Sequence, residues 1–430
     1  MSLAPATLPK VHRLANGAVV ICDSAPGFET LALSVVAGRG ARWEAPVHAG
    51  WSHLLEHMVF KGAGSRSARD IAEVIEAAGG QINAATGHER TSFQVRALAG
   101  GLPLAMAVTA DLVQRPTLDP EDLAREKHVV LQEIAEAADA PDDQVFELAQ
   151  AAAFADQPLG RPILGVRSAI DPATPASLEA WRAALYAPDR LVISAAGAID
   201  EEELLRLAED GFGAAASGAP QTPAAGVFTG GAARERRKLE QAHLVFLLPA
   251  PGVADPDHWA LRLFVETLGG GMSSRLFQEA RERLGLAYAI DAYSDAYADV
   301  GVLGVYAGCA PADSGKLAEV AAVEIRRLIG HIEPAELARA KAQLKAGLFM
   351  SRESLAARAE QAAAQMLAFG RLLEPAEMGE KIDAVTPEDI ARIGARLLAP
   401  AACAVSVLGP KAAMDAPERF EAALLGQGRT

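Results

Sequence analysis

Cysteine is scarce in this sequence. Its 430 residues include three cysteines, Cys22, Cys309 and Cys403, which lie far apart and form no C-x-x-C pair. An odd number of scattered cysteines excludes a disulfide framework and fits a reducing compartment.

Long apolar runs are also missing. No stretch approaches the roughly 20 apolar residues that a membrane-spanning helix needs. Residues 1–17 have no apolar core and little arginine, so we expect neither a secretory signal nor a transit peptide. These features predict a soluble cytoplasmic protein, and the alanine-rich composition indicates a bacterial one.

Positive charge is in deficit. Lysine and arginine number 40 against 55 aspartates and glutamates, which gives a net charge of −15. This balance argues against nucleic acids and anionic membranes as partners, and it favours basic peptides over acidic ones. The length predicts two to three domains with substantial cores.

Two histidines lie four residues apart, with Glu56 directly before the second. In a helix, His53 and His57 share one face, so both imidazoles could reach one zinc ion. The pattern H-x-x-E-H is the inverted form of the metalloprotease motif H-E-x-x-H. The apolar neighbours leave a second reading open, in which both histidines are ordinary residues of a buried helix. A third ligand decides between these readings, because catalytic zinc usually takes three protein ligands.

Two glutamates recur on a helix that we expect to begin at Asp119-Pro120, where proline suits the first turn. Glu126 and Glu133 are seven residues apart and therefore share one helix face. From the residues alone, a solvated face explains this pair.

The chain repeats itself at a constant spacing. In both halves a Thr-Pro pair, a proline and a glycine follow in order: Thr174-Pro175, Pro188 and Gly197, then Thr386-Pro387, Pro400 and Gly409. The segment 214–231 is rich in Ala, Gly, Pro and Thr and reads as a linker. We therefore predict two related domains, 1–213 and 232–430, of which the second lacks a histidine pair.

The chain resembles a known family, the M16 (pitrilysin-type) zinc peptidases. Within this family it resembles subfamily B, which includes mitochondrial processing peptidase and its bacterial relatives. The residues that carry the resemblance are the motif helix through Lys61-Gly62, the segment from Asn83-Ala84 to Thr91, the helix from Glu126 to Glu133, and the run from Leu268 to Leu276 with Gly285-Leu286-Ala287-Tyr288.

The resemblance implies a zinc-dependent endopeptidase with one zinc ion per chain. His53, His57 and Glu133 match the family's zinc ligands. Glu56 matches the general base that takes a proton from the zinc-bound water. Glu126 matches an acid that supports the ligands and belongs to the catalytic set. The resemblance replaces the solvated-face reading of the two glutamates.

The resemblance also implies residues that bind substrate. Asn83 and Ala84 match a strand edge that pairs with an extended peptide. Arg281 and Tyr288, in the second domain, match a pair that holds substrate near the zinc.

Two further acids, Asp143 and Glu147, match residues that bind arginine near the cleavage site in processing peptidases. An ordinary acidic helix face is the other reading of this pair.

The implied fold is α+β, with two homologous domains, each a mixed, largely antiparallel sheet with helices packed on one side. Family resemblance implies a clamshell around unfolded or short peptides. Some family members carry four such domains in one chain, and this chain has half that length, so the resemblance also implies a homodimer. The alternative is a non-catalytic structural or partner subunit of the same fold, since such relatives exist and commonly lose zinc ligands.

Overall fold

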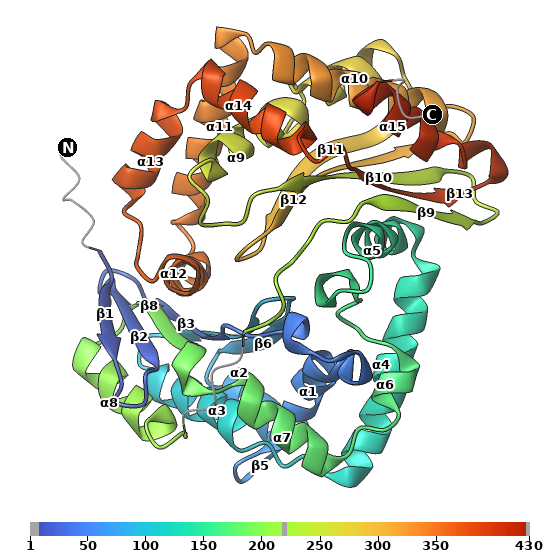
Figure 1. The fold of residues 1–430 in the computed structure, drawn as a ribbon. Helices are drawn as coiled ribbons and strands as arrows, with labels where there is room; N and C mark the ends of the chain where they lie inside the picture. Colours follow the sequence, from blue (N-terminus) through green and yellow to red (C-terminus); the bar gives the residue numbers. More distant parts are fainter. Residues whose placement is uncertain (1–7, 217–221, 427–430) are drawn as a thin grey trace. The chain divides into compact units, whose positions relative to one another are not determined.

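The computed structural model describes residues 8–216 and 222–426. They form two compact units (Figure 1), each built from segments that are far apart in the sequence. The first unit takes its described residues from 1–134, 162–223 and 349–374, and the second takes them from 135–161, 224–348 and 375–430. The expected division at 214–231 stays a prediction, and residues 217–221 of that linker lie outside the described residues.

The first unit is organised by a six-stranded sheet. In spatial order its strands are β1 (Lys10–Arg13), β2 (Val19–Ser24), β8 (Leu191–Gly197), β3 (Thr30–Ala37), β7 (Thr91–Leu98) and β6 (Gln81–Thr86). Only β2 and β8 pair in parallel among these neighbours, and the other pairs are antiparallel. The sheet is therefore mixed and largely antiparallel, as expected.

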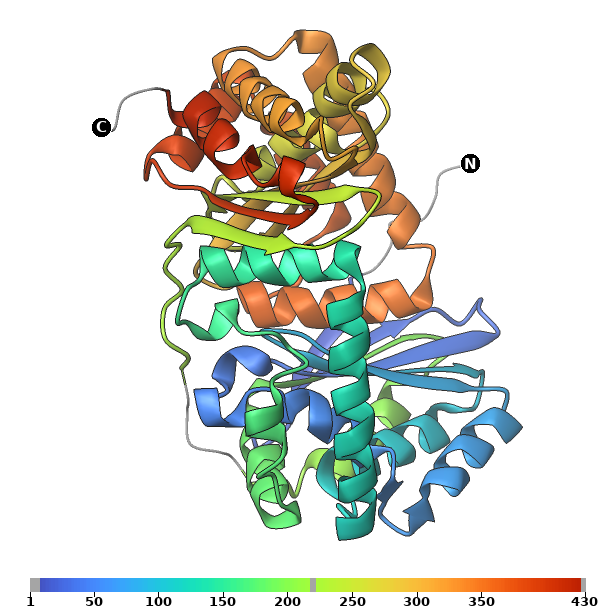
Figure 2. The same ribbon diagram turned by 90° about the vertical axis from the view of Figure 1, so that its right-hand side faces the viewer.

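Most helices of this unit pack against one face of the sheet (Figure 2). They are α1 (Trp51–Val59), α2 (Ala68–Ala77), α3 (Leu102–Gln114), the first part of α4 (Pro120–Asp139), α6 (Arg167–Ile170), α7 (Pro175–Leu185) and α8 (Glu201–Phe212). A short hairpin of β4 (Gly62–Ala63) and β5 (Arg66–Ser67) follows α1.

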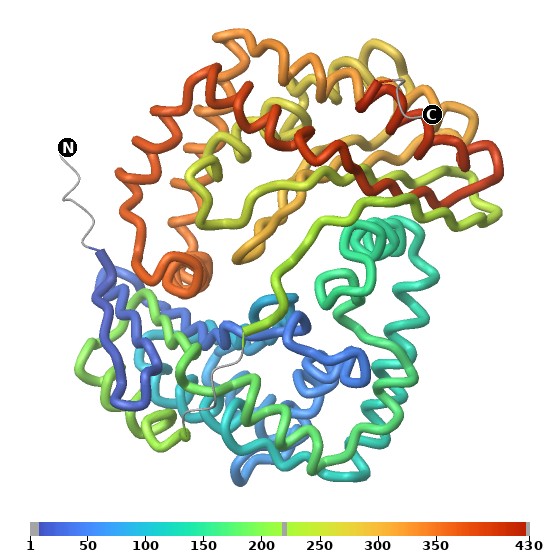
Figure 3. Tube along the Cα trace, in the orientation of Figure 1, coloured from blue at the N-terminus to red at the C-terminus, as the bar shows by residue number. Residues whose placement is uncertain are grey.

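One helix covers the other face of the first sheet. It is α12 (Leu355–Phe369), whose Ala362, Ala363 and Met366 pack on buried strand residues such as Ile21 and Val192. Figure 3 shows this late segment beside the strands from the beginning of the chain. Its sequence position alone would assign it to the other half of the chain.

The second unit repeats the topology of the first. Its five strands are, in order, β9 (Gly231–Arg236), β13 (Ala404–Gly409), β10 (Ala242–Ala250), β12 (Gly301–Cys309) and β11 (Ala287–Ala296). They correspond one by one to β2, β8, β3, β7 and β6, and the parallel pair stands at the same place. This shared order is what two homologous domains predict.

The helices of the second unit also divide between the two faces of its sheet. Among the described residues, a single helix, α5 (Pro141–Ala153), packs on the face of Val245 and Leu247, while Phe246 stacks on Phe420 from the opposite face. The other helices are α9 (His258–Gly269), α10 (Ser314–Gly330), α11 (Pro334–Ser351), α13 (Pro375–Ala384), α14 (Pro387–Leu398) and α15 (Ala416–Leu425), with a helical segment at Phe277–Arg283.

Local sequence signals fix several helix starts. Ser67, Thr174 and Thr386 each accept a backbone N–H in a capping box, and the last two mark the repeat found in the sequence. The motif helix begins at Trp51 and no earlier. The reason is Gly50, which adopts a left-handed φ of 93° and separates a short turn at Pro46–His48 from the helix. Among the described residues, no helix combines the length and apolarity needed to cross a bilayer.

Candidate metal centre

Helix α1 presents both motif histidines on one face. Its opposite face is apolar, and Leu54, Leu55 and Met58 are fully buried in the core of the first unit. The rings of His53 and His57 lie with their centroids 4.7 Å apart, which is the arrangement that i,i+4 spacing predicts. Burial of the apolar face therefore fixes the direction in which the imidazoles point.

The beginning of α1 is anchored by a residue that the sequence reasoning missed. Glu44 is buried, and its carboxylate accepts the backbone N–H groups of Gly50 at 2.8 Å and Ser52 at 2.7 Å. A Cβ at Gly50 would come within 2.6 Å of the carbonyl oxygen of Leu164, so no capping side chain fits there. Glu44 thus satisfies free N–H groups at the helix start. No local pattern signals this role, because Glu44 lies outside the helix.

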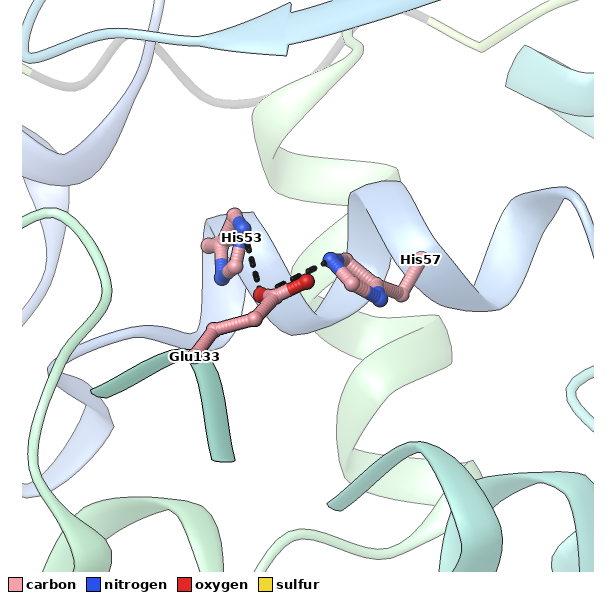
Figure 4. Close-up of side chains that lie close together, drawn as sticks. All are labelled: His53, His57 and Glu133. Atoms are coloured by element: carbon pink, nitrogen blue, oxygen red, sulfur yellow. Dashed lines mark ion pairs between the residues drawn. The ribbon is translucent and has the colours of Figure 1, made fainter. Parts of the chain in front are cut away.

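Glu133 of α4 completes a cluster with the two histidines (Figure 4). Its Oε2 lies 3.5 Å from Nε2 of His53 and 3.3 Å from Nε2 of His57. Two ligands that hold a tetrahedral zinc ion at about 2.0–2.1 Å lie roughly 3.4 Å apart. The two distances from Glu133 therefore fit a zinc ion held by these three side chains, whose ligand atoms all lie within 4.8 Å of one another.

Glu126, which lies seven residues before Glu133 on the same face of α4, orients His57. Its Oε2 lies 3.1 Å from Nδ1 of His57, and its Oε1 lies 2.8 Å from the ammonium of Lys61. With its proton on Nδ1, His57 turns the lone pair of Nε2 towards Glu133. Lys61 is a second residue whose role the sequence reasoning missed.

The polar atoms at the centre fit a bound cation. Oε2 of Glu133 is buried and, among the residues that the structure describes, has no hydrogen-bond partner. It faces the Nε2 lone pair of His57, and two lone pairs at this distance repel each other unless a cation or a proton lies between them. Burial lowers the pKa of His53 to about 4, and the nearby His57 acts in the same direction. His53 is therefore neutral near pH 7, which is the form of imidazole that binds a metal.

Glu56 lies on the same helix beside this cluster. It is half-buried, and burial raises the pKa of its carboxyl group, while bonding to Thr86 works in the opposite direction. A carboxylate whose pKa moves towards neutrality is suited to exchange protons. The structure thus brings His53, His57, Glu133, Glu126 and Glu56 together, and their chemical roles stay predictions.

The predicted substrate strand is an edge strand. β6 ends the strand order of its sheet, so among the described residues its outer side has no strand partner. Asn83 is exposed on it, while Ala84 is partly buried against the core. An unpaired edge of this kind can accept an extended peptide.

The remaining predicted residues belong to the second unit. The guanidinium of Arg281 lies 5.6 Å from the ring centre of Tyr288, whose side chain is exposed at the start of β11. Asp143 and Glu147 are exposed one turn apart on α5, a helix that the expected boundary assigned to the first domain. The structure pairs Arg281 with Tyr288, and the substrate role of all four residues stays a prediction.

Comparison with known families gives two adjoining matches. The family model described as insulinase (peptidase family M16) matches residues 19–167. The family model described as peptidase M16 inactive domain matches residues 172–344. An uncharacterized zinc protease of Rickettsia bellii is 35% identical over 401 residues, which cover 93% of this chain and 97% of the relative.

Solved structures share the fold. A protease from Helicobacter pylori superposes with a TM-score of 0.85 at 20% identity, covering 94% of this chain and all of that one. A chain of complex III2 from Candida albicans gives 0.83 at 20% identity, covering 96% of this chain and 99% of its own. The same architecture therefore occurs in a protease and in a chain of complex III2.

Removal of Glu126 should weaken zinc binding. In Glu126→Ala, His57 loses the partner that fixes its ring, and we expect a zinc affinity roughly 10- to 100-fold lower. Competition with a chromophoric chelator measures this affinity. Glu121→Ala, which removes an exposed acid from the same helix, serves as the control. Equal affinities for both variants would show that Glu126 does not support the site.

Removal of Glu44 should destabilise the first unit. Glu44→Ala leaves the N–H groups of Gly50 and Ser52 buried without that acceptor, at a cost of about 2 kcal/mol or more. Urea unfolding followed by tryptophan fluorescence measures the change, because Trp51 and Trp181 report on this unit. An unchanged midpoint in Glu44→Ala would contradict the anchoring role.

Proposed function

We propose, from the premise that this chain belongs to peptidase family M16, that it is a zinc-dependent endopeptidase that hydrolyses extended, unfolded peptides. The observation that carries the proposal is the convergence of His53, His57 and Glu133, with Glu56 beside them on the same helix. The zinc-protease name of the Rickettsia relative supports it.

One zinc ion per chain would be held by the two imidazoles and the Glu133 carboxylate. When bound, zinc supplies a Lewis acid that polarises a carbonyl group and makes water more acidic. Glu56 takes the proton from the attacking water and later returns it to the leaving amine. Glu126 holds His57 in the required tautomer, and Lys61 in turn holds Glu126.

The peptide would bind as an added strand along β6, next to Asn83 and Ala84. Backbone pairing of this kind requires an extended substrate and excludes folded proteins. We further propose that Arg281 and Tyr288 contact the peptide and that Asp143 and Glu147 favour basic side chains. The active form we propose is a homodimer in the cytoplasm of a bacterium.

The alternative is a non-catalytic subunit of the same fold, and a chain of complex III2 shares that fold. Such a subunit has no need for three converging donors, an orienting acid and a neighbouring carboxylate. This chain has the complete set, and its presence favours an enzyme over a non-catalytic subunit.

Glu56→Gln tests the proposed base. Glutamine keeps the size of the side chain but cannot take a proton, so we expect zinc to be retained and turnover to fall by roughly 100-fold or more. Cleavage of a fluorogenic peptide and metal analysis of the same samples measure both quantities. Glu76→Gln, at an exposed position on α2, is the control and should behave like the wild type. Wild-type turnover in Glu56→Gln would remove Glu56 from the mechanism.

A comparison of folded and unfolded forms of one substrate tests the strand-pairing proposal. A small disulfide-bonded protein should resist cleavage, and its reduced and alkylated form should be cut, because only the unfolded chain can pair along β6. Mass spectrometry of the digests compares the two rates on one sequence. Equal rates would contradict this binding mode.

A further inference from the structure

The Glu56 carboxylate is held by a hydroxyl group from the edge strand. Oγ1 of Thr86 donates a hydrogen bond to Oε2 of Glu56 at 2.5 Å. The short distance is typical of a hydroxyl bound to a charged carboxylate. Within the part of the chain that the structure describes, Thr86 supplies the one side-chain hydrogen bond to Glu56. The side chain of Thr86 is therefore the one that restrains this carboxylate.

The alternation of β6 aims Thr86 at this carboxylate. Ile82 and Ala84, at alternate positions on the strand, pack against the helical core of the first unit. Thr86 shares their side of the strand, because side chains alternate between the two faces. Its hydroxyl therefore points to the side of the sheet on which α1 lies.

The backbone around Thr86 is fixed on both sides. Thr86 is paired with Thr91 of β7, and the N–H of Gly87 donates to the carbonyl of Arg90 at 2.8 Å in the turn that follows. The carbonyl of Gly87 in turn accepts the N–H of Ala41 at 3.0 Å. A hydroxyl on such a strand end can hold a flexible glutamate in one rotamer, which a loop residue could not do as well.

We propose that Thr86 is a positioning residue for the proposed base Glu56, whose carboxylate its hydroxyl group holds in one orientation. This inference rests on the proposed peptidase function. Loss of the hydroxyl should therefore reduce turnover more than substrate affinity.

Three substitutions test the role of Thr86. Thr86→Val keeps the shape and removes the hydroxyl, and it should lower kcat roughly 10- to 100-fold while KM and zinc content stay close to the wild type. Thr86→Ser restores the donor and should recover most of the turnover. Thr91→Val is the matched control, because Thr91 bonds the carbonyl of Arg39 and does not bond Glu56. Melting temperatures of all variants identify any that fail to fold.

A structural measurement complements the kinetics. In crystals of the zinc-loaded protein, Glu56 should occupy one rotamer in the wild type and in Thr86→Ser, and several in Thr86→Val. Zinc-dependent cleavage by the wild type supports the proposed function without reference to Thr86. If Thr86→Val then matches the wild type, or Thr86→Ser is as slow as Thr86→Val, the positioning role is wrong and the peptidase stands. A wild type that cleaves no peptide overturns the function and, with it, the role of Thr86 in turnover.

Discussion

The first unit depends on one electrostatic constraint, the close approach of two imidazole nitrogens and a buried carboxylate oxygen. Donor atoms 3.3 and 3.5 Å apart repel one another unless a cation or proton lies between them. The surrounding structure holds them together: Glu44 anchors α1, and the Lys61–Glu126 pair fixes the ring of His57. A zinc ion bound between these donor atoms would replace their repulsion with attraction and would thereby stabilise the folded protein.

The second unit shows what the fold is without this constraint. Its strands follow the same order, and α9 follows β10 as α1 follows β3. At the approximate sequence equivalents of the motif, α9 carries Val265, Leu268 and Gly269, which are buried. The shared architecture therefore does not require a metal, and the donors of α1 are an addition to it.

Sequence reasoning succeeded where the signal is local. The spacing of His53 and His57 predicted one helix face, and the recurring Thr-Pro pairs at Thr174 and Thr386 predicted two related domains. It could not bring Glu133 to the histidines from periodicity alone, because their contact depends on how α4 packs beside α1, so only the family resemblance proposed it. Exchange of α5 and α12 between the two halves is likewise a tertiary feature, since neither helix differs in pattern from its neighbours.

Anomalous X-ray diffraction at the zinc absorption edge, on crystals of the zinc-loaded protein, tests the account most directly. The account predicts one strong peak per chain, bound by Nε2 of His53, Nε2 of His57 and the carboxylate of Glu133. Absence of a peak among these side chains, or a peak held by other residues, would contradict the assignment of this cluster as the metal centre.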